Sequence, residues 1–179
     1  MAQAMDAERQ LATFIAKFND EVGSLAEAIL GEMHRLYPTA LELVYDNYNA
    51  LAIGFGPTER ASEAIFSIAL FPRWVSLFFL QAKGLSDSGK ILRGSGSVAR
   101  HIVLPSPDML HDPLVQDLMK EATARAKVPF DSNGAHRLII KSISATQRTR
   151  RPAAERAIRV APPEKKSKGK KAQTGAKQK

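Results

Sequence analysis

Over the first 36 residues, apolar side chains recur every three or four positions, which is the period of an α-helix. The pair Asn19-Asp20 interrupts this pattern with residue types that favour helix N-termini. The spacing therefore predicts a short helix over residues 6–18 and a longer helix over 20–36. Tyr37-Pro38 ends the second helix, because proline disfavours helical backbone at the residue before it. One continuous helix is the alternative.

From residue 41 onward, short apolar runs rich in β-branched and aromatic residues replace the helical period. Two of these runs are separated only by Pro72-Arg73, which predicts a hairpin, and Asp112-Pro113 predicts the start of a helix that continues to about residue 127. The predicted strands cover residues 41–45, 49–55, 64–71, 74–81, 100–104 and 136–143.

Together these elements predict an α+β fold with two layers, in which a mainly antiparallel sheet of five to six strands packs against helices. The strand at 74–81 is apolar on both faces, and two-sided hydrophobicity indicates two-sided burial. We expect one face to meet the N-terminal helices. The other face is expected to meet the helix at 112–127 or a second copy of the chain, as in a homodimer.

The composition fits one domain with an appended tail. The chain has 179 residues, of which 44% are hydrophobic, and we place the domain at residues 1–147 and the tail at 148–179. There is no cysteine, which excludes disulfides, thiolate metal sites and cysteine nucleophiles and favours a reducing compartment. No apolar run approaches the ~20 residues that span a bilayer, and the N-terminus lacks a secretion pattern, so we expect a soluble, cytoplasmic protein without a membrane partner.

Positive charge is concentrated in the tail. Residues 148–179 hold 12 of the 26 lysines and arginines and two acidic residues, which leaves the rest of the chain with a net charge of about −2. A tail of this composition is expected to be disordered. It could contact nucleic acid through phosphates, or it could simply increase solubility. The candidate nucleic-acid contacts are Lys165, Lys166, Lys168, Lys170 and Lys171.

Two polar clusters are candidates for a binding site. The first is Tyr45, Asp46, Tyr48 and Asn49, at the junction of two predicted strands, where a plain turn is the simpler interpretation. The second is a glycine-rich loop that could hold an anion with its backbone amides and an arginine, and a flexible connection is its alternative. The candidate residues of that loop are Gly94, Ser95, Gly96, Arg100 and His101.

Metal and enzyme chemistry receive little support from spacing. The four histidines follow no metal-ligand pattern, so the sequence predicts no metal site, and no nucleophile–base pair can be named. Several carboxylates fall on the second helix and the next strand, where hard cations could use them, although a solvated helix face is the stronger explanation. These residues are Asp20, Glu27, Glu32, Glu42 and Asp46.

Four segments of the chain form a recognisable set: Leu43-Val-Tyr-Asp-Asn-Tyr-Asn-Ala50, Gly54-Phe-Gly-Pro-Thr-Glu-Arg60, Phe71-Pro-Arg-Trp-Val-Ser-Leu-Phe-Phe79 and Leu92-Arg-Gly-Ser-Gly96 followed by Arg100-His-Ile102. These segments carry a resemblance, over about residues 18–151, to the YdhG-like domain family, a bacterial family largely of unknown function. The resemblance implies a small α+β domain similar in arrangement to frataxin, and it implies that both polar clusters belong to one site.

Three functions follow as hypotheses. The first is a non-enzymatic module that binds a small polar or anionic ligand between the turn at 45–49 and the loop at 94–101. The second is iron binding or delivery, by analogy with frataxin, and fold analogy is its only warrant. The third is association with nucleic acid through the tail. No cofactor other than iron is suggested, and the sequence favours a binding protein over an enzyme.

Overall fold

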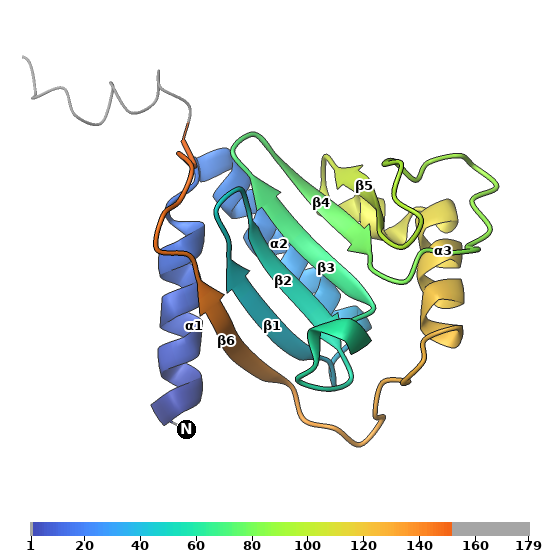
Figure 1. Cartoon of the computed structure of the whole chain (residues 1–179), viewed down its shortest axis with the longest axis horizontal. Helices are drawn as coiled ribbons and strands as arrows, with labels where there is room; N and C mark the ends of the chain where they lie inside the picture. Colours follow the sequence, from blue (N-terminus) through green and yellow to red (C-terminus); the bar gives the residue numbers. More distant parts are fainter. Residues whose placement is uncertain (1, 152–179) are drawn as a thin grey trace, which may run out of the picture.

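The computed structural model describes residues 2–151, which form an α+β fold with one sheet (Figure 1). In chain order the elements are α1 (Ala2–Ile15), α2 (Asp20–Leu36), β1 (Leu41–Asp46), β2 (Leu51–Gly56), η1 (Ala61–Glu63), β3 (Phe66–Phe71), β4 (Trp74–Phe79), β5 (Arg100–Leu104), η2 (Pro107–His111), α3 (Pro113–Ala124) and β6 (Arg137–Ile143). The predicted fold class is confirmed. Residues 152–179 of the predicted tail lie outside the described residues, as do the lysines assigned to nucleic acid. Residues 148–151, which the predicted tail also includes, are described and contact the domain, with Arg148 bonded to Tyr48 and Arg150 buried.

The six strands pair in the order β5-β4-β3-β2-β1-β6. Consecutive strands from β1 to β5 are antiparallel neighbours, as short connections favour. The last strand differs, because β6 returns along the sheet and pairs in parallel with β1. This return places the segment around residue 136 beside the start of β1, although about 94 residues separate the two in sequence.

The helices α2 and α3 begin where the sequence predicts. Asn19 caps α2 by accepting a hydrogen bond from the backbone N–H of Val22 at 2.9 Å, which separates α2 from α1 and rejects a single continuous helix. Asp112 caps α3 in the same manner through the N–H of Leu114, also at 2.9 Å. The first helix extends over Ala2–Ile15, so it begins four residues earlier and ends three residues earlier than the predicted range of 6–18.

The main core lies between the helices and one face of the sheet. Alternate residues of the central strands point into it, with Ile53 and Phe55 from β2 and Ile68 from β3 fully buried. α2 supplies Ile29 and Met33 to the same cluster. Figure 1 shows α2 crossing behind the sheet, with α1 beside β6.

The opposite face of the sheet has no helix over it among the described residues (Figure 1). The buried side chains of α3 join the core on the α2 side, so α3 does not cover this face, contrary to one of the two predictions. Self-association through this face stays a prediction. None of the helices in residues 2–151 combines the length and the apolar character that crossing a membrane requires.

Candidate metal centre

Three potential metal ligands, His34, Glu42 and His136, meet at the end of the sheet where β1 begins. His34 lies in the last turn of α2, and the short connection after Pro38 leads directly into β1, so Glu42 lies close to it. The parallel pairing of Leu41 with Arg137 then brings His136, which precedes β6, alongside. The two imidazole rings are 5.0 Å apart between centroids.

Glu42 is the buried member of this cluster, with a side chain that has 0% solvent exposure. Its Oε1 atom contacts Nε2 of His34 and lies 2.8 Å from Nε2 of His136. Its Oε2 atom has no hydrogen-bond partner among residues 2–151. One carboxylate oxygen therefore has two partners while the other, equally buried, has none, which is a costly arrangement for a polar group.

The histidines form the open side of the cluster. The side chains of His34 and His136 are 45% and 36% exposed, so solvent reaches the imidazoles although it does not reach Glu42. His34 also packs against the ring of Phe55, at 6.3 Å between centroids. The cluster is thus bounded by an aromatic ring on one side and open to solvent at the two histidines.

The electrostatics of the cluster favour a negative carboxylate beside positive charge. Burial acts to raise the pKa of Glu42, but hydrogen bonds from His136 and His34 outweigh it, so the pKa falls below its ordinary value. The hydrogen bond to Glu42 raises the pKa of His136 against a smaller opposing effect of burial, and the charge of Glu8 adds to the rise. The buried carboxylate is therefore ionised and attracts cations.

Two imidazole nitrogens and one carboxylate are a common ligand set for first-row divalent metal ions. All three donor atoms lie within 4.8 Å of one another. At ligand bonds of about 2.0–2.2 Å, neighbouring donors of a tetrahedral ion are about 3.4 Å apart. The exposed imidazoles would therefore rotate away from Oε1 to admit one ion between the three donors. Three protein ligands with a solvent-facing side also leave coordination positions open.

The side chains of the predicted turn cluster do not converge on one point. Asp46 is fully buried on the core side of β1 and pairs with Lys17 at 2.5 Å and with Arg150 at 3.1 Å. Tyr45 projects from the opposite face of the strand, and Tyr48 is 53% exposed. Asn49 is also exposed. The carboxylate therefore has a structural role, holding the end of the described chain to the sheet.

In the predicted glycine-rich cluster, Arg100 contacts residues of the preceding loop. Arg100 donates to the carbonyl oxygen of Leu92 at 2.5 Å and lies 3.8 Å from the carboxylate of Asp87. His101 stacks on Phe78, with ring centroids 4.8 Å apart. Gly94 has a φ of 98°, a conformation that favours glycine, whereas Ser95 and Gly96 are exposed.

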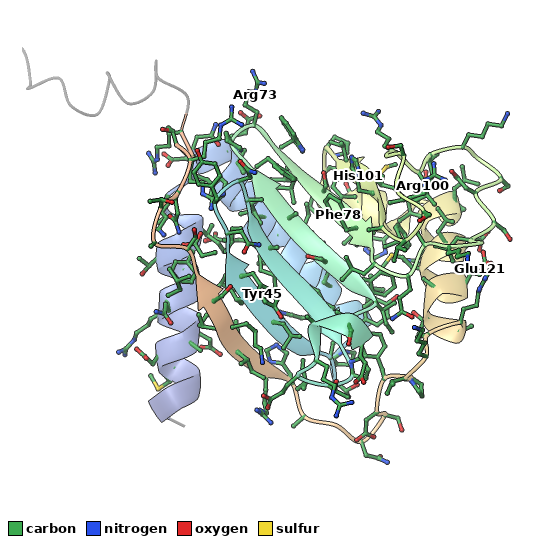
Figure 2. The ribbon with its side chains drawn as sticks, in the orientation of Figure 1. Tyr45, Arg73, Phe78, Arg100, His101 and Glu121 are labelled. Atoms are coloured by element: carbon green, nitrogen blue, oxygen red, sulfur yellow. The ribbon has the colours of Figure 1, made fainter. Side chains whose placement is uncertain are left out.

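These two clusters do not share a cavity. β2, β3 and β4 lie between β1 and β5, and four steps of 4.7–4.9 Å separate the outer strands by about 19 Å. The pairing registers also place Asp46 in line with Leu104, at the opposite end of the sheet from Arg100. Figure 2 shows Tyr45 well apart from Phe78, Arg100 and His101. The single pocket predicted between them is not formed.

The acidic residues proposed for iron are also dispersed. Glu32 pairs with Arg35 and with His111, and Asp46 pairs with the two cations described above. Asp20 and Glu27 lie along a groove between α1 and α2. Only Glu42 joins a cluster of metal-ligand type among the described residues.

Sequence spacing did not reveal the cluster, because its histidines are 8 residues before and 94 residues after Glu42. Sequence motifs for metal binding within one helix or loop cannot predict a site whose ligands are brought together by the parallel pairing of β6 with β1. One local signal exists. Glu42 and Val44 both lie on the inward face of β1, and a carboxylate at such a core position needs a polar partner.

Comparisons of the chain with protein-family models, with curated proteins and with solved structures found no match. The resemblance to the YdhG-like family therefore stays a prediction that rests on the motifs quoted above.

Proposed function

We propose that this protein binds a divalent first-row transition-metal ion, such as Zn²⁺ or Fe²⁺, through His34, Glu42 and His136. The observation that carries the proposal is the buried carboxylate of Glu42, which faces two imidazole nitrogens and keeps one oxygen without a partner in the described part of the chain. An ion held between the three groups would replace the close contacts of Oε1 with the imidazoles, and coordination through both carboxylate oxygens would give Oε2 a partner as well.

The ligand types narrow the class of ion. Imidazole suits Zn²⁺, Fe²⁺, Co²⁺ and Ni²⁺, whereas Ca²⁺ and Mg²⁺ prefer sites made of oxygen atoms. With two nitrogen ligands and one carboxylate, selectivity should favour the transition metals. This agrees with iron as a cargo, one of the hypotheses from the sequence, but it relies on a different set of residues.

The partly exposed histidines bear on what the bound ion does. Three protein ligands leave room for water or for a small anionic ligand in the remaining positions. The hypothesis of a small anionic ligand can therefore be transferred from Arg100 to the metal, where the open coordination positions would receive it.

Isothermal titration calorimetry with Zn²⁺ and Co²⁺ tests the proposal. We expect one ion to bind per chain, and we expect His34→Ala and His136→Ala to weaken binding by more than about 100-fold, since loss of a group that only orients a ligand already costs 10–100-fold. Mg²⁺ should produce no comparable heat.

His111→Ala is the matched control, because His111 is also partly exposed and also contacts a carboxylate, that of Glu32 at 3.2 Å. This variant should bind as the wild type does. Equal affinity in the wild type and in both ligand variants would show that the three residues form only a structural ion-paired cluster.

A further inference from the structure

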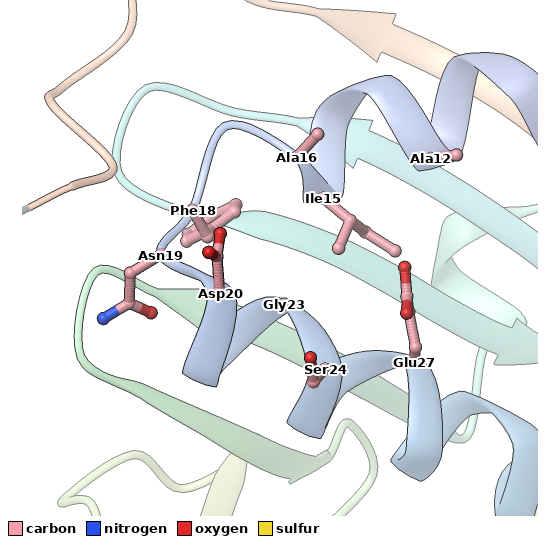
Figure 3. Close-up of a pocket in the computed structure, with 9 residues that line it drawn as sticks. All are labelled: Ala12, Ile15, Ala16, Phe18, Asn19, Asp20, Gly23, Ser24 and Glu27. Atoms are coloured by element: carbon pink, nitrogen blue, oxygen red, sulfur yellow. The ribbon is translucent and has the colours of Figure 1, made fainter. Parts of the chain in front are cut away.

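A groove runs between the two N-terminal helices, along the N-terminal half of α2, whereas His34 lies in the last turn of that helix. It encloses a cavity of about 210 Å³. Its floor is apolar, with buried Ile15 and Phe18, and Figure 3 shows the carboxylates of Asp20 and Glu27 extending from α2 toward α1. The remaining lining residues are small or polar: Ala12, Ala16, Asn19, Gly23 and Ser24.

The described chain ends at the mouth of this groove. Arg150 is buried against the ring of Phe18, at 5.1 Å from its centroid. Arg151 donates a hydrogen bond to the carbonyl oxygen of Ala16 at 2.8 Å and lies 3.8 Å from Asp20. The side chain of Arg151 is 16% exposed, so the last described residue already occupies one end of the groove.

The residues that follow have the length and the charge to continue along it. Asp20 and Glu27 are separated by seven helical residues, or about 10 Å at 1.5 Å per residue. Four extended residues cover that distance, and 28 residues follow Arg151. The stretch 153–160 combines three alanines, Ile158 and Val160 with Arg156, Arg159 and one acidic residue, Glu155, which gives it a net charge of +1. The lysine-rich stretch after residue 164 has no apolar side chain larger than alanine.

We propose that residues 153–160 of the same chain dock in the groove between α1 and α2. Ile158 then covers the apolar floor made by Ile15 and Phe18. Arg156 and Arg159 then face Glu27, which forms no ion pair with the residues that the structure describes, and Arg151 holds the start of the segment at the groove. The lysine-rich stretch beyond this segment would leave the domain from a defined place, at the end of the groove.

Paramagnetic NMR on the full-length protein tests this docking. Because the chain has no cysteine, Ala157→Cys provides a single attachment point for a nitroxide label. We expect the label to broaden the amide signals of residues 12–27 and to leave those of α3 unaffected. If the amides of α1 and α2 are broadened no more than those of α3, docking in this groove is rejected.

Charge reversal shows whether Glu27 is the contact. Glu27 is exposed, so Glu27→Lys should leave the fold intact. The substitution should nevertheless strongly reduce the broadening of the amide signals. Adding Arg156→Glu and Arg159→Glu to that variant should restore it. Glu59→Lys, in the exposed loop after β2, is the control and should leave the broadening unchanged. Broadening that survives Glu27→Lys and is unaffected by the added reversals would overturn the assigned contact.

A second copy of the chain is the alternative occupant. Mixing ¹⁵N protein that lacks the nitroxide with ¹⁴N protein that carries it separates the two cases. In this mixture the observed amides can be broadened only by a nitroxide on another molecule. Broadening within the labelled chain alone supports the proposal. Broadening of equal size in the mixed sample would replace it with an intermolecular contact.

Discussion

At the scale of single residues, His101 is a candidate for ligand binding from the sequence, and in the structure its side chain packs against the sheet. Its ring stacks on Phe78 with planes 25° apart, on the face of the sheet opposite the helices. Burial, together with the charge of Arg93, lowers the pKa of His101 below its ordinary value of 6.5. The ring is thus held neutral, and its place in the stack depends on staying so.

This depressed pKa predicts a pH dependence of stability. Because the folded protein binds the proton less readily than the unfolded chain, the contribution of His101 is fully present above pH 6.5 and is lost as the pH falls through the folded pKa. An NMR titration of the His101 ring should give a pKa below 6.5. Urea unfolding of His101→Phe should lose less stability than the wild type between pH 7 and pH 5. A ring pKa at or above 6.5 would contradict this.

At the scale of elements, Asp46, Lys17 and Arg150 join β1 to α1 and to the last described residues. Arg150 is buried, at 4% exposure, and its guanidinium donates to Asp46 at 3.1 Å and to the carbonyl oxygen of Asn47 at 2.5 Å. Burial lowers the pKa of Arg150, while the charge of Asp46 opposes that effect. The pair therefore depends on both partners being present.

Removing one partner should destabilise the fold strongly. Arg150→Ala leaves the carboxylate of Asp46 buried with only Lys17 for compensation, and breaking a buried pair of this kind costs about 3–5 kcal/mol. Arg137→Ala breaks an exposed pair with Glu59 and should cost about 0–1 kcal/mol. Urea unfolding measures both free energies. Similar losses in the two variants would show that Asp46 does not anchor the chain end.

The elements themselves could largely be predicted from the sequence, and the site could not. Periodicity and turn residues are local signals, so the cap at Asn19, the turn at Pro72-Arg73 and the start of α3 at Asp112 are all confirmed. Strand order is not a local property. The parallel return of β6 to β1 assembles the cluster at Glu42, and the three strands between β1 and β5 separate the predicted pocket.

Side-chain type also misled where burial decided the role. Asp46 belongs to a turn-like run of polar residues, but its position on the inward face of β1 makes it an internal ion-pair partner. Glu42 lies on the same face of β1, four residues before Asp46. Its partners are histidines, whereas the partners of Asp46 are a lysine and an arginine. Because only histidine can release its proton to bind a metal at neutral pH, the two buried carboxylates differ in what they can do.

At the scale of the whole molecule, the protein has a helix-covered face and an open face, and its candidate sites lie at the margins of the covered layer. The metal ligands occupy the end of the sheet where α2 meets β1, and the groove proposed for the tail lies along α1 and α2. The two sites share α2 but no residue. Loading the metal and docking the tail are therefore expected to be separable by substitution.

The central claim is that one ion occupies the space between His34, Glu42 and His136, and anomalous X-ray diffraction tests it most directly. Crystals grown with Zn²⁺ and measured on both sides of the zinc absorption edge should show one strong peak about 2.0–2.2 Å from both Nε2 atoms and from the Glu42 carboxylate. A zinc-saturated crystal in which Glu42 still contacts both imidazoles directly, with no anomalous peak between them, would contradict the claim.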